Sequence, residues 1–351
     1  MVTAVVYDCE GPHLNNEERA FFKDADPWGF ILFARHCESP EQMRRLCTDL
    51  REAVGRNAPI MIDQEGGRVA RMRSTQNSAW QDHPPMGVFG ELWRLDPERA
   101  RNATWLNAYL LGQMIAECGV SVDCIPMLDV RQMDSDPVTL GDRALAAHPD
   151  IVSALGHAVF SGLSAGGALP IIKHLPGLGR AQCDSHYALP TVSTQMNDLE
   201  EIDFKPFQTL SADPINAPMG MTAHIVYEAL DPAQCATYSP TIIQEIIREK
   251  IGFDGLLFTD DIKMEALGDP YPERARKSLA AGCDIALACN FSLEQKQDIA
   301  SAIPKLTGLA ARRAERAQSW GDRSSFPAPD IERSPQSLRW LIKSVWPPAM
   351  A

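Results

Sequence analysis

Short apolar runs alternate along this chain with segments of helical pattern, and no other feature restricts the fold as strongly. The helical segments carry typical start signals, such as Ser39-Pro40 and Ser239-Pro240, in which Ser caps the helix and Pro occupies its first turn. Alternation of this kind predicts parallel strands joined by crossover helices. About eight such units over roughly 300 residues favour a closed barrel over an open sheet, so we predict an α/β fold with a single (β/α)₈ TIM-type barrel. The predicted strands lie at residues 4–7, 30–33, 60–62, 122–127, 170–172, 219–221, 256–258 and 285–288.

A long insertion separates the third strand run from the fourth. It occupies residues 63–121 and contains Pro84-Pro85 and a helical stretch over residues 97–118. We expect any irregularity in strand order to lie here, near the third and fourth units. The chain as a whole fits one barrel domain over residues 1–351, because 351 residues with 45% hydrophobic content can bury one large core.

The chain ends in a tail, from about residue 320, that is rich in Ser, Pro and charge. A helical pattern over residues 293–318 precedes this tail. We expect the tail to pack on the barrel or on a partner, or to be partly mobile, because apolar residues recur within it. These residues are Trp340, Leu341, Ile342, Val345 and Trp346.

Composition excludes several classes of protein. The net charge of −13, from 46 acidic and 33 basic residues, argues against a nucleic-acid partner and is compatible with a small neutral or amphoteric substrate. Nine cysteines without a CxxC pair predict neither a disulfide framework nor a structural zinc site. The first residues lack the basic start of a signal peptide, and no apolar run approaches the ~20 residues of a membrane span. We therefore expect a cytoplasmic protein without a membrane partner.

Polar residues follow nearly every predicted strand. Strands often end in polar turn residues, so a single residue of this kind has an ordinary structural explanation. A barrel, however, would bring all of them to one rim, where such folds place their sites. The residues are Asp8, Arg35, Asp63, Asp129, Lys173, His174, His224, Asp260, Asp261 and Asn290.

The most informative segment is the Gly- and Pro-rich stretch that begins at Lys173-His174 and ends at Asp184-Ser185-His186. Asp184 and His186 are separated by one residue in a predicted loop, so the carboxylate can fold back toward the imidazole. Such a contact would raise the histidine pKa and suit it to proton transfer near neutral pH. The alternative is an ordinary polar turn.

Two further motifs carry candidate groups. Asp260-Asp261 follows a predicted strand, so one carboxylate should face the rim, where it could act as a nucleophile. The alternative is a helix N-cap, since residues 262–267 have the pattern of a helix start. Asp63 and Arg71 flank a Gly-Gly pair after the third strand, and carboxylates with Arg suit a hydroxyl-rich ligand. Arg143 lies in another predicted turn.

These motifs together resemble family 3 glycoside hydrolases of the bacterial β-N-acetylhexosaminidase type, which act in peptidoglycan recycling. The resemblance covers most of the chain, and several long motifs in the right order make it specific. The motifs span residues 31–35, 62–69, 141–143, 173–186, 221–224 and 258–261.

The resemblance implies a single catalytic barrel that works without a cofactor or metal. Asp260 would attack the anomeric carbon and form a covalent glycosyl-enzyme. His186, partnered by Asp184 on a mobile loop, would be the acid/base in place of the second carboxylate of most retaining glycosidases. The implied activity is that of a retaining exo-β-N-acetylglucosaminidase acting on muropeptide fragments. The residues implied to hold the terminal N-acetylglucosamine are Asp63, Arg71, Arg143, Lys173 and His174.

Three alternatives remain open at this point. A phosphorylase, which uses phosphate instead of water in the second step, shares every motif above. A metal-dependent barrel hydrolase could use His174, His186 and His224 with the Asp pair, although the first strand lacks an HxH pattern. A sugar-binding protein without activity is the third. The chain also departs from the family at Leu178, where a polar residue is common, and this bears on the preference for the leaving group.

Overall fold

Short parallel strands form one sheet, and the strands at its two edges are neighbours in the sequence. The computed structural model describes residues 2–212, 215–319 and 328–347. In the sheet, β5 pairs with β4 at one edge and β6 pairs with β8 at the other. Only Ile171 separates β5 from β6, and its N–H donates to the carbonyls of Asp123 and Ile125, so the sheet closes into a barrel. The order is β5 (Leu169–Pro170), β4 (Val122–Asp123), β3 (Ile60–Ile62), β2 (Pro27–Leu32), β1 (Thr3–Tyr7), β11 (Ile285–Ala288), β10 (Leu256–Asp261), β8 (Met219–Thr222) and β6 (Ile172–Leu175).

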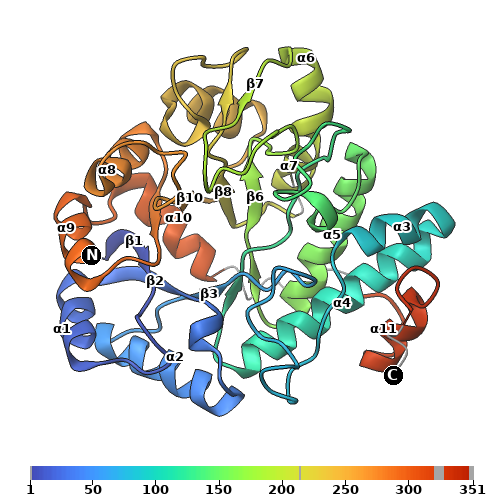
Figure 1. The fold of residues 1–351 in the computed structure, drawn as a ribbon, viewed down its shortest axis with the longest axis horizontal. Coiled ribbons are helices and arrows are strands. Elements are labelled where there is room, and N and C mark those ends of the chain that lie inside the picture. Colours follow the sequence, from blue (N-terminus) through green and yellow to red (C-terminus); the bar gives the residue numbers. More distant parts are fainter. Residues whose placement is uncertain (1, 213–214, 320–327, 348–351) are drawn as a thin grey trace.

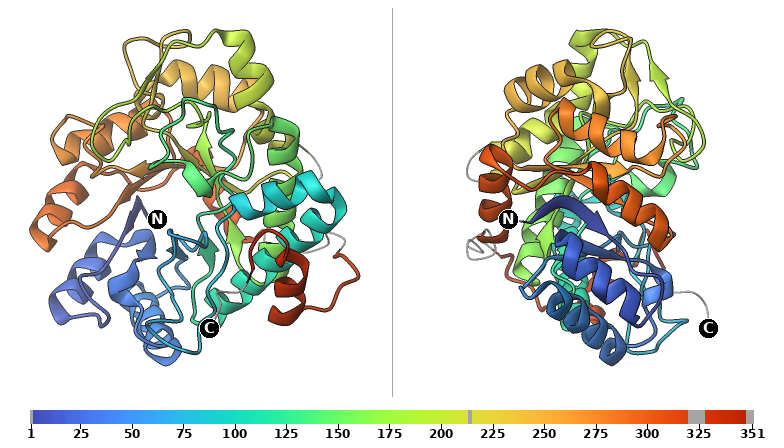
Figure 2. Two further views of the ribbon diagram at one scale, coloured as in Figure 1. Left: turned by 45° about the vertical axis from the view of Figure 1, so that its right-hand side comes forward. Right: turned by 90° about the vertical axis from the view of Figure 1, so that its left-hand side faces the viewer.

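Helices follow the strands and surround the barrel (Figures 1 and 2). The predicted α/β class and the TIM-type barrel are therefore confirmed. The helical elements, in chain order, are α1 (Asn16–Ala25), η1 (Ala34–His36), α2 (Pro40–Val54), α3 (Gly87–Leu95), α4 (Pro97–Glu117), η2 (Gly141–Arg143), α5 (Pro149–Ala165), α6 (Met196–Asp198), η3 (Leu199–Asp203), α7 (Lys205–Ser211), η4 (Ala236–Tyr238), η5 (Ile242–Lys250), α8 (Tyr271–Ala281), α9 (Leu293–Ala302), α10 (Gly308–Ser319) and α11 (Pro335–Ile342).

Strand order is sequential around the whole barrel. The expected irregularity near the third and fourth units is therefore not found, because β3 and β4 pair directly in spite of the long insertion between them. The insertion forms α3 and α4, which lie outside the sheet (Figure 1). A separate parallel pair, β7 (Thr191–Val192) with β9 (Val226–Tyr227), joins the loop after β6 to the loop after β8.

The predicted helix starts are present as capped ends. Ser39 Oγ accepts a hydrogen bond from Gln42 N at 3.2 Å, and Ser239 Oγ accepts one from Ile242 N at 3.0 Å. The helix predicted over residues 293–318 is instead two helices, α9 and α10. Pro304 explains the break, because it forces the preceding residue, Ile303, into an extended conformation and lacks the N–H that would continue the helix.

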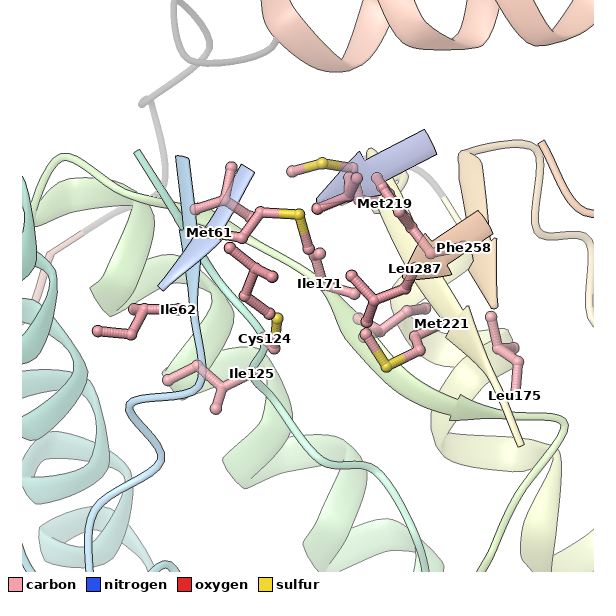
Figure 3. Packing of buried hydrophobic residues seen from close by; sticks show 14 of the residues in the cluster. Met61, Ile62, Cys124, Ile125, Ile171, Leu175, Met219, Met221, Phe258 and Leu287 are labelled. Atoms are coloured by element: carbon pink, nitrogen blue, oxygen red, sulfur yellow. The ribbon is translucent and has the colours of Figure 1, made fainter. Parts of the chain in front are cut away.

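Alternate side chains of the strands fill the barrel. Figure 3 shows Met61, Ile171 and Leu287 pointing toward one another, while Ile62 points toward the surrounding helices. All four side chains are nearly or fully buried. This two-sided burial is why the strands read in sequence as continuous apolar runs rather than as alternating ones.

Part of the tail packs on the insertion. Leu338, Leu341 and Ile342 of α11 are buried, and α11 contacts α4. Residues 320–327 and 348–351 of the predicted tail lie outside the described residues. Among the helices that the structure describes, none combines the length and the apolar character that crossing a lipid bilayer requires.

Candidate active site

A pocket of about 340 Å³ opens at the carboxyl ends of the strands, where a barrel of this kind gathers its strand-to-helix loops. The structure brings all eight predicted site residues together there. They line this one pocket although they come from four separate segments of the chain: Asp63, Arg71, Arg143, Lys173, His174, Asp184, His186 and Asp260.

One wall of the pocket is a network of charged side chains, which are buried at Lys173 and Glu65 and partly exposed at Arg143, Asp63 and Arg71. Lys173 Nζ lies 3.1 Å from Asp63 Oδ1 and 2.7 Å from Glu65 Oε1. Arg143 donates to both oxygens of Glu65, through Nε at 2.9 Å and Nη2 at 2.8 Å. Arg71 Nη2 lies 3.3 Å from the other oxygen of Asp63. The network therefore fixes two carboxylates and three cations in place before any ligand arrives.

Opposite charges set the protonation states in this wall. Burial alone would raise the pKa of Glu65, but Arg143 and Lys173 hold it well below its usual value. Burial also works against the charged form of Lys173, yet Glu65 and Asp63 raise the pKa of this amine. Glu65 and Lys173 are therefore both ionised at neutral pH. Glu65 lies within the motif at residues 62–69 but is not among the predicted site residues, although it is the member that joins Lys173 to Arg143.

Replacing Glu65 by Leu should lower the free energy of unfolding by roughly 3–5 kcal/mol, because it leaves Arg143 without its carboxylate partner and Lys173 with Asp63 alone. Urea denaturation followed by circular dichroism measures the change. The matched control is Glu91→Leu, which breaks an exposed ion pair to Arg94 on α3 and should lower stability by less than about 1 kcal/mol. Equal losses in the two variants would show that the buried network does not hold this wall together.

The two acids at the end of β10 have different environments. Asp260 Oδ2 lies 3.9 Å from His174 Nε2, and Asp260 Oδ1 accepts a hydrogen bond from Asp261 N at 2.8 Å. Burial acts to raise the pKa of Asp260, but His174 and the Asp261 N–H hold it below its usual value, so this carboxylate is charged at neutral pH. Asp261 accepts backbone N–H bonds from Lys263 and Cys289, and burial raises its pKa to about 7. Residues 262–267 form turns, so the alternative of a helix N-cap does not apply.

Buried acceptors orient the histidines beside Asp260. His174 Nδ1 lies 2.7 Å from Asp129 Oδ2, and Asp129 Oδ1 also accepts from Leu178 N at 2.6 Å. His224 Nδ1 lies 2.7 Å from Thr237 Oγ1. Asp129 follows a predicted strand, but no sequence pattern indicates its contact with His174. The contact follows from barrel closure, which brings the ends of β4 and β6 together.

Asp184 and His186 form the contact that their spacing predicted. His186 Nδ1 lies 2.8 Å from Asp184 Oδ1, and the same oxygen accepts the backbone N–H of His186 at 2.9 Å. The His186 side chain remains 67% exposed, so its ring is open to a ligand. The loop is held against the wall of the pocket, because Glu265 N and Ala266 N donate to the carbonyls of His186 and Ser185. These donors follow Asp260 closely in the chain, which brings the loop and this carboxylate to the same pocket.

Comparison with known protein families assigns this architecture. Residues 2–319 match the glycosyl hydrolase family 3 N terminal domain. The chain belongs to glycosyl hydrolase family 3. A family 3 relative from Alkalilimnicola ehrlichii, named Beta-hexosaminidase, is 38% identical over 285 residues, which are 80% of this chain and 79% of the relative. Another of the same name, from Chromobacterium violaceum, is 33% identical over 347 residues, 96% of this chain and 94% of the relative.

A solved bacterial structure has the same overall fold. NagZ from Neisseria gonorrhoeae, crystallised in complex with N-trifluoroacetyl-D-glucosamine, superposes with a TM-score of 0.81 at 28% identity, over 98% of this chain and 96% of NagZ. The predicted family and enzyme class are confirmed, and this family 3 protein is a glycoside hydrolase of the β-hexosaminidase type.

The histidines of the metal-site alternative have other partners. His174, His186 and His224 bond to Asp129, Asp184 and Thr237 respectively. Within residues 2–212, 215–319 and 328–347, no three His, Cys, Asp or Glu side chains are grouped so as to hold a metal ion.

Proposed function

We propose that this family 3 hydrolase is a retaining exo-β-N-acetylglucosaminidase that removes terminal N-acetylglucosamine from muropeptide fragments, in one catalytic barrel domain. The observation that carries the proposal is a charged carboxylate, Asp260, in the same pocket as the hydrogen-bonded pair of Asp184 and an exposed His186. These are the two functions that a retaining glycosidase needs, a nucleophile and a group that exchanges a proton with the leaving group and with water.

In the first step, Asp260 attacks the anomeric carbon through an oxocarbenium-like transition state and forms a covalent glycosyl-enzyme. His174 supports this role in two ways. The His174 ring, fixed by Asp129, keeps the Asp260 carboxylate charged. His174 Nε2 lies 3.9 Å from Asp260 Oδ2, so this oxygen makes no short contact with the ring.

His186 protonates the glycosidic oxygen as the leaving group departs and then takes a proton from the attacking water. Asp184 holds the ring by Nδ1, so the other nitrogen is the one that exchanges the proton. A histidine with one carboxylate places less negative charge beside the leaving group than a second catalytic carboxylate would.

The charged wall supports recognition of one terminal sugar. Carboxylates such as Asp63 accept hydrogen bonds from hydroxyl groups, and Arg71, Lys173 and Arg143 donate them. A volume of about 340 Å³ is near the lower end of the range for small-molecule sites, which suits one sugar ring rather than a long chain. The N-acetylglucosamine analogue bound to NagZ from Neisseria gonorrhoeae supports the choice of sugar.

Water rather than phosphate should accept the sugar in the second step. With an aryl N-acetyl-β-glucosaminide as substrate, we expect free N-acetylglucosamine as the product at every concentration of inorganic phosphate, and an unchanged rate of aryl release. Chromatography with mass detection separates the free sugar from its phosphate ester. A phosphate ester that replaces the free sugar as phosphate increases would identify the enzyme as a phosphorylase instead.

A further inference from the structure

A buried ion pair ties the loop that carries His186 to the body of the protein. Arg180, in this loop, donates from Nε to Asp203 Oδ2 at 2.7 Å. The Asp203 side chain is 0% exposed and that of Arg180 is 16% exposed. Asp203 is the last residue of η3, and Leu199 and Phe204 in the same stretch of chain are fully buried, so this end of the pair is anchored in the core.

The first half of the loop is held close to Asp203. Gly177 has a φ of +145°, and a Cβ at this position would lie 3.2 Å from Asp203 Cβ. Tyr227 donates its hydroxyl to the Gly177 carbonyl, and Ser135 Oγ donates to the Gly179 carbonyl at 2.6 Å. A side chain at 177 would crowd Asp203, so the loop can approach Asp203 this closely only with Gly at that turn.

Apart from their bond to each other, the charged groups of Arg180 and Asp203 lack hydrogen-bond partners at two buried atoms in the part of the chain that the structure describes. Among the described residues, Asp203 Oδ1 and Arg180 Nη2 are buried without a hydrogen-bond partner. Burial raises the pKa of Asp203 to about 6, and Arg180 opposes this shift. Buried ion pairs contribute little net stability, and in some proteins they instead select one geometry. The pair is therefore better suited to fixing the position of the loop than to stabilising the fold.

We propose that Arg180 and Asp203 are positioning residues that place His186 for acid catalysis. This inference rests on the proposed role of His186 as the acid/base. Arg180 precedes His186 by six positions in the same loop. When the pair is broken, the loop loses its buried anchor, and the imidazole is no longer held within reach of the glycosidic oxygen.

The test uses Arg180→Met in the full chain, with two aryl N-acetyl-β-glucosaminides as substrates. One substrate carries a nitrophenol leaving group, which departs with little acid assistance, and the other carries an unsubstituted phenol, which needs protonation. We expect kcat for the phenyl substrate to fall by roughly 10- to 100-fold, since displacement of a catalytic group by about 1 Å has effects of this size. The nitrophenyl substrate should lose less than about threefold, because acid catalysis contributes little to it. Asp203→Asn should give the same pattern.

The matched control is Gln182→Ala, which removes an exposed loop contact, from Gln182 Nε2 to Asp134 Oδ2 at 2.8 Å, and should leave both rates unchanged. Combination with His186→Ala isolates the mechanism. In that background, Arg180→Met should have no further effect on the phenyl substrate, because the group that it positions is absent.

Three results would overturn the inference: equal losses on both substrates, no loss on either, or a loss that persists in the His186→Ala background. Thermal melting identifies a variant that does not fold, and if Asp203→Asn is such a variant, Arg180→Met decides alone. If His186 were not the acid, His186→Ala alone would lose activity equally on the two substrates. This result separates a failure of the proposed function from a failure of the inference about Arg180 and Asp203.

Discussion

Replacement of Asp260 by Asn should lower kcat/KM for aryl N-acetyl-β-glucosaminides by roughly 10⁴-fold or more, because the amide cannot form the glycosyl-enzyme. Asn preserves the size of the side chain and can still accept the hydrogen bond from Asp261 N. The fold should therefore survive, and KM should change far less than kcat. Initial rates over a range of substrate concentrations, with circular dichroism to verify folding, measure both parameters.

The neighbouring acid provides the matched control. Asp261 accepts two backbone N–H bonds, and burial raises its pKa to about 7, so it is partly protonated at neutral pH. Asn at position 261 retains an acceptor for these bonds, and we expect less than about a tenfold loss, as for a residue outside the chemical step. A greater loss from Asp261→Asn than from Asp260→Asn would mean that the nucleophile has been assigned to the wrong acid.

Replacement of His186 by Ala should lower kcat by roughly 10²- to 10⁴-fold for substrates with poor leaving groups, which is the usual contribution of general acid catalysis. The effect should shrink steadily as the leaving group improves, because a better leaving group needs less protonation. A plot of log kcat against leaving-group pKa, for the parent enzyme and the variant, measures this dependence.

His148→Ala is the control for loss of an exposed imidazole. His148 caps α5, its side chain is 61% exposed, and it does not line the pocket, so the slope of the plot should stay that of the parent. Parallel lines for the parent enzyme and His186→Ala, offset by the same factor at every leaving group, would contradict acid catalysis by His186.

The barrel and most of the site could be predicted from sequence for a physical reason. Parallel strands buried on both faces read as apolar runs, and the closed barrel then brings the polar residues after each run to a single rim. Lys173, His174 and Asp260 meet in one pocket because of this topology. The Asp184 and His186 contact was predictable because it is local, with one residue between the partners.

Contacts between distant segments could not be predicted in this way. Glu65 follows its strand like many polar turn residues, and only the folded barrel shows that Lys173 and Arg143 converge on it. Arg180 and Asp203 are likewise 23 positions apart, with β7 and α6 between them, so no sequence pattern pairs them. The break between α9 and α10 is different, since Pro304 marks it in the sequence.

Trapping the glycosyl-enzyme intermediate is the most direct test of Asp260 as the nucleophile. A fluorinated N-acetylglucosaminyl fluoride should inactivate the enzyme by forming a glycosyl-enzyme that turns over slowly, and peptide mapping by mass spectrometry locates the attached sugar. We expect one labelled peptide, with the sugar on Asp260, and no labelling in Asp260→Asn. A sugar attached to Asp63, Glu65 or Asp184, or an inactivated enzyme that carries no sugar, would contradict the assignment of Asp260 as the nucleophile.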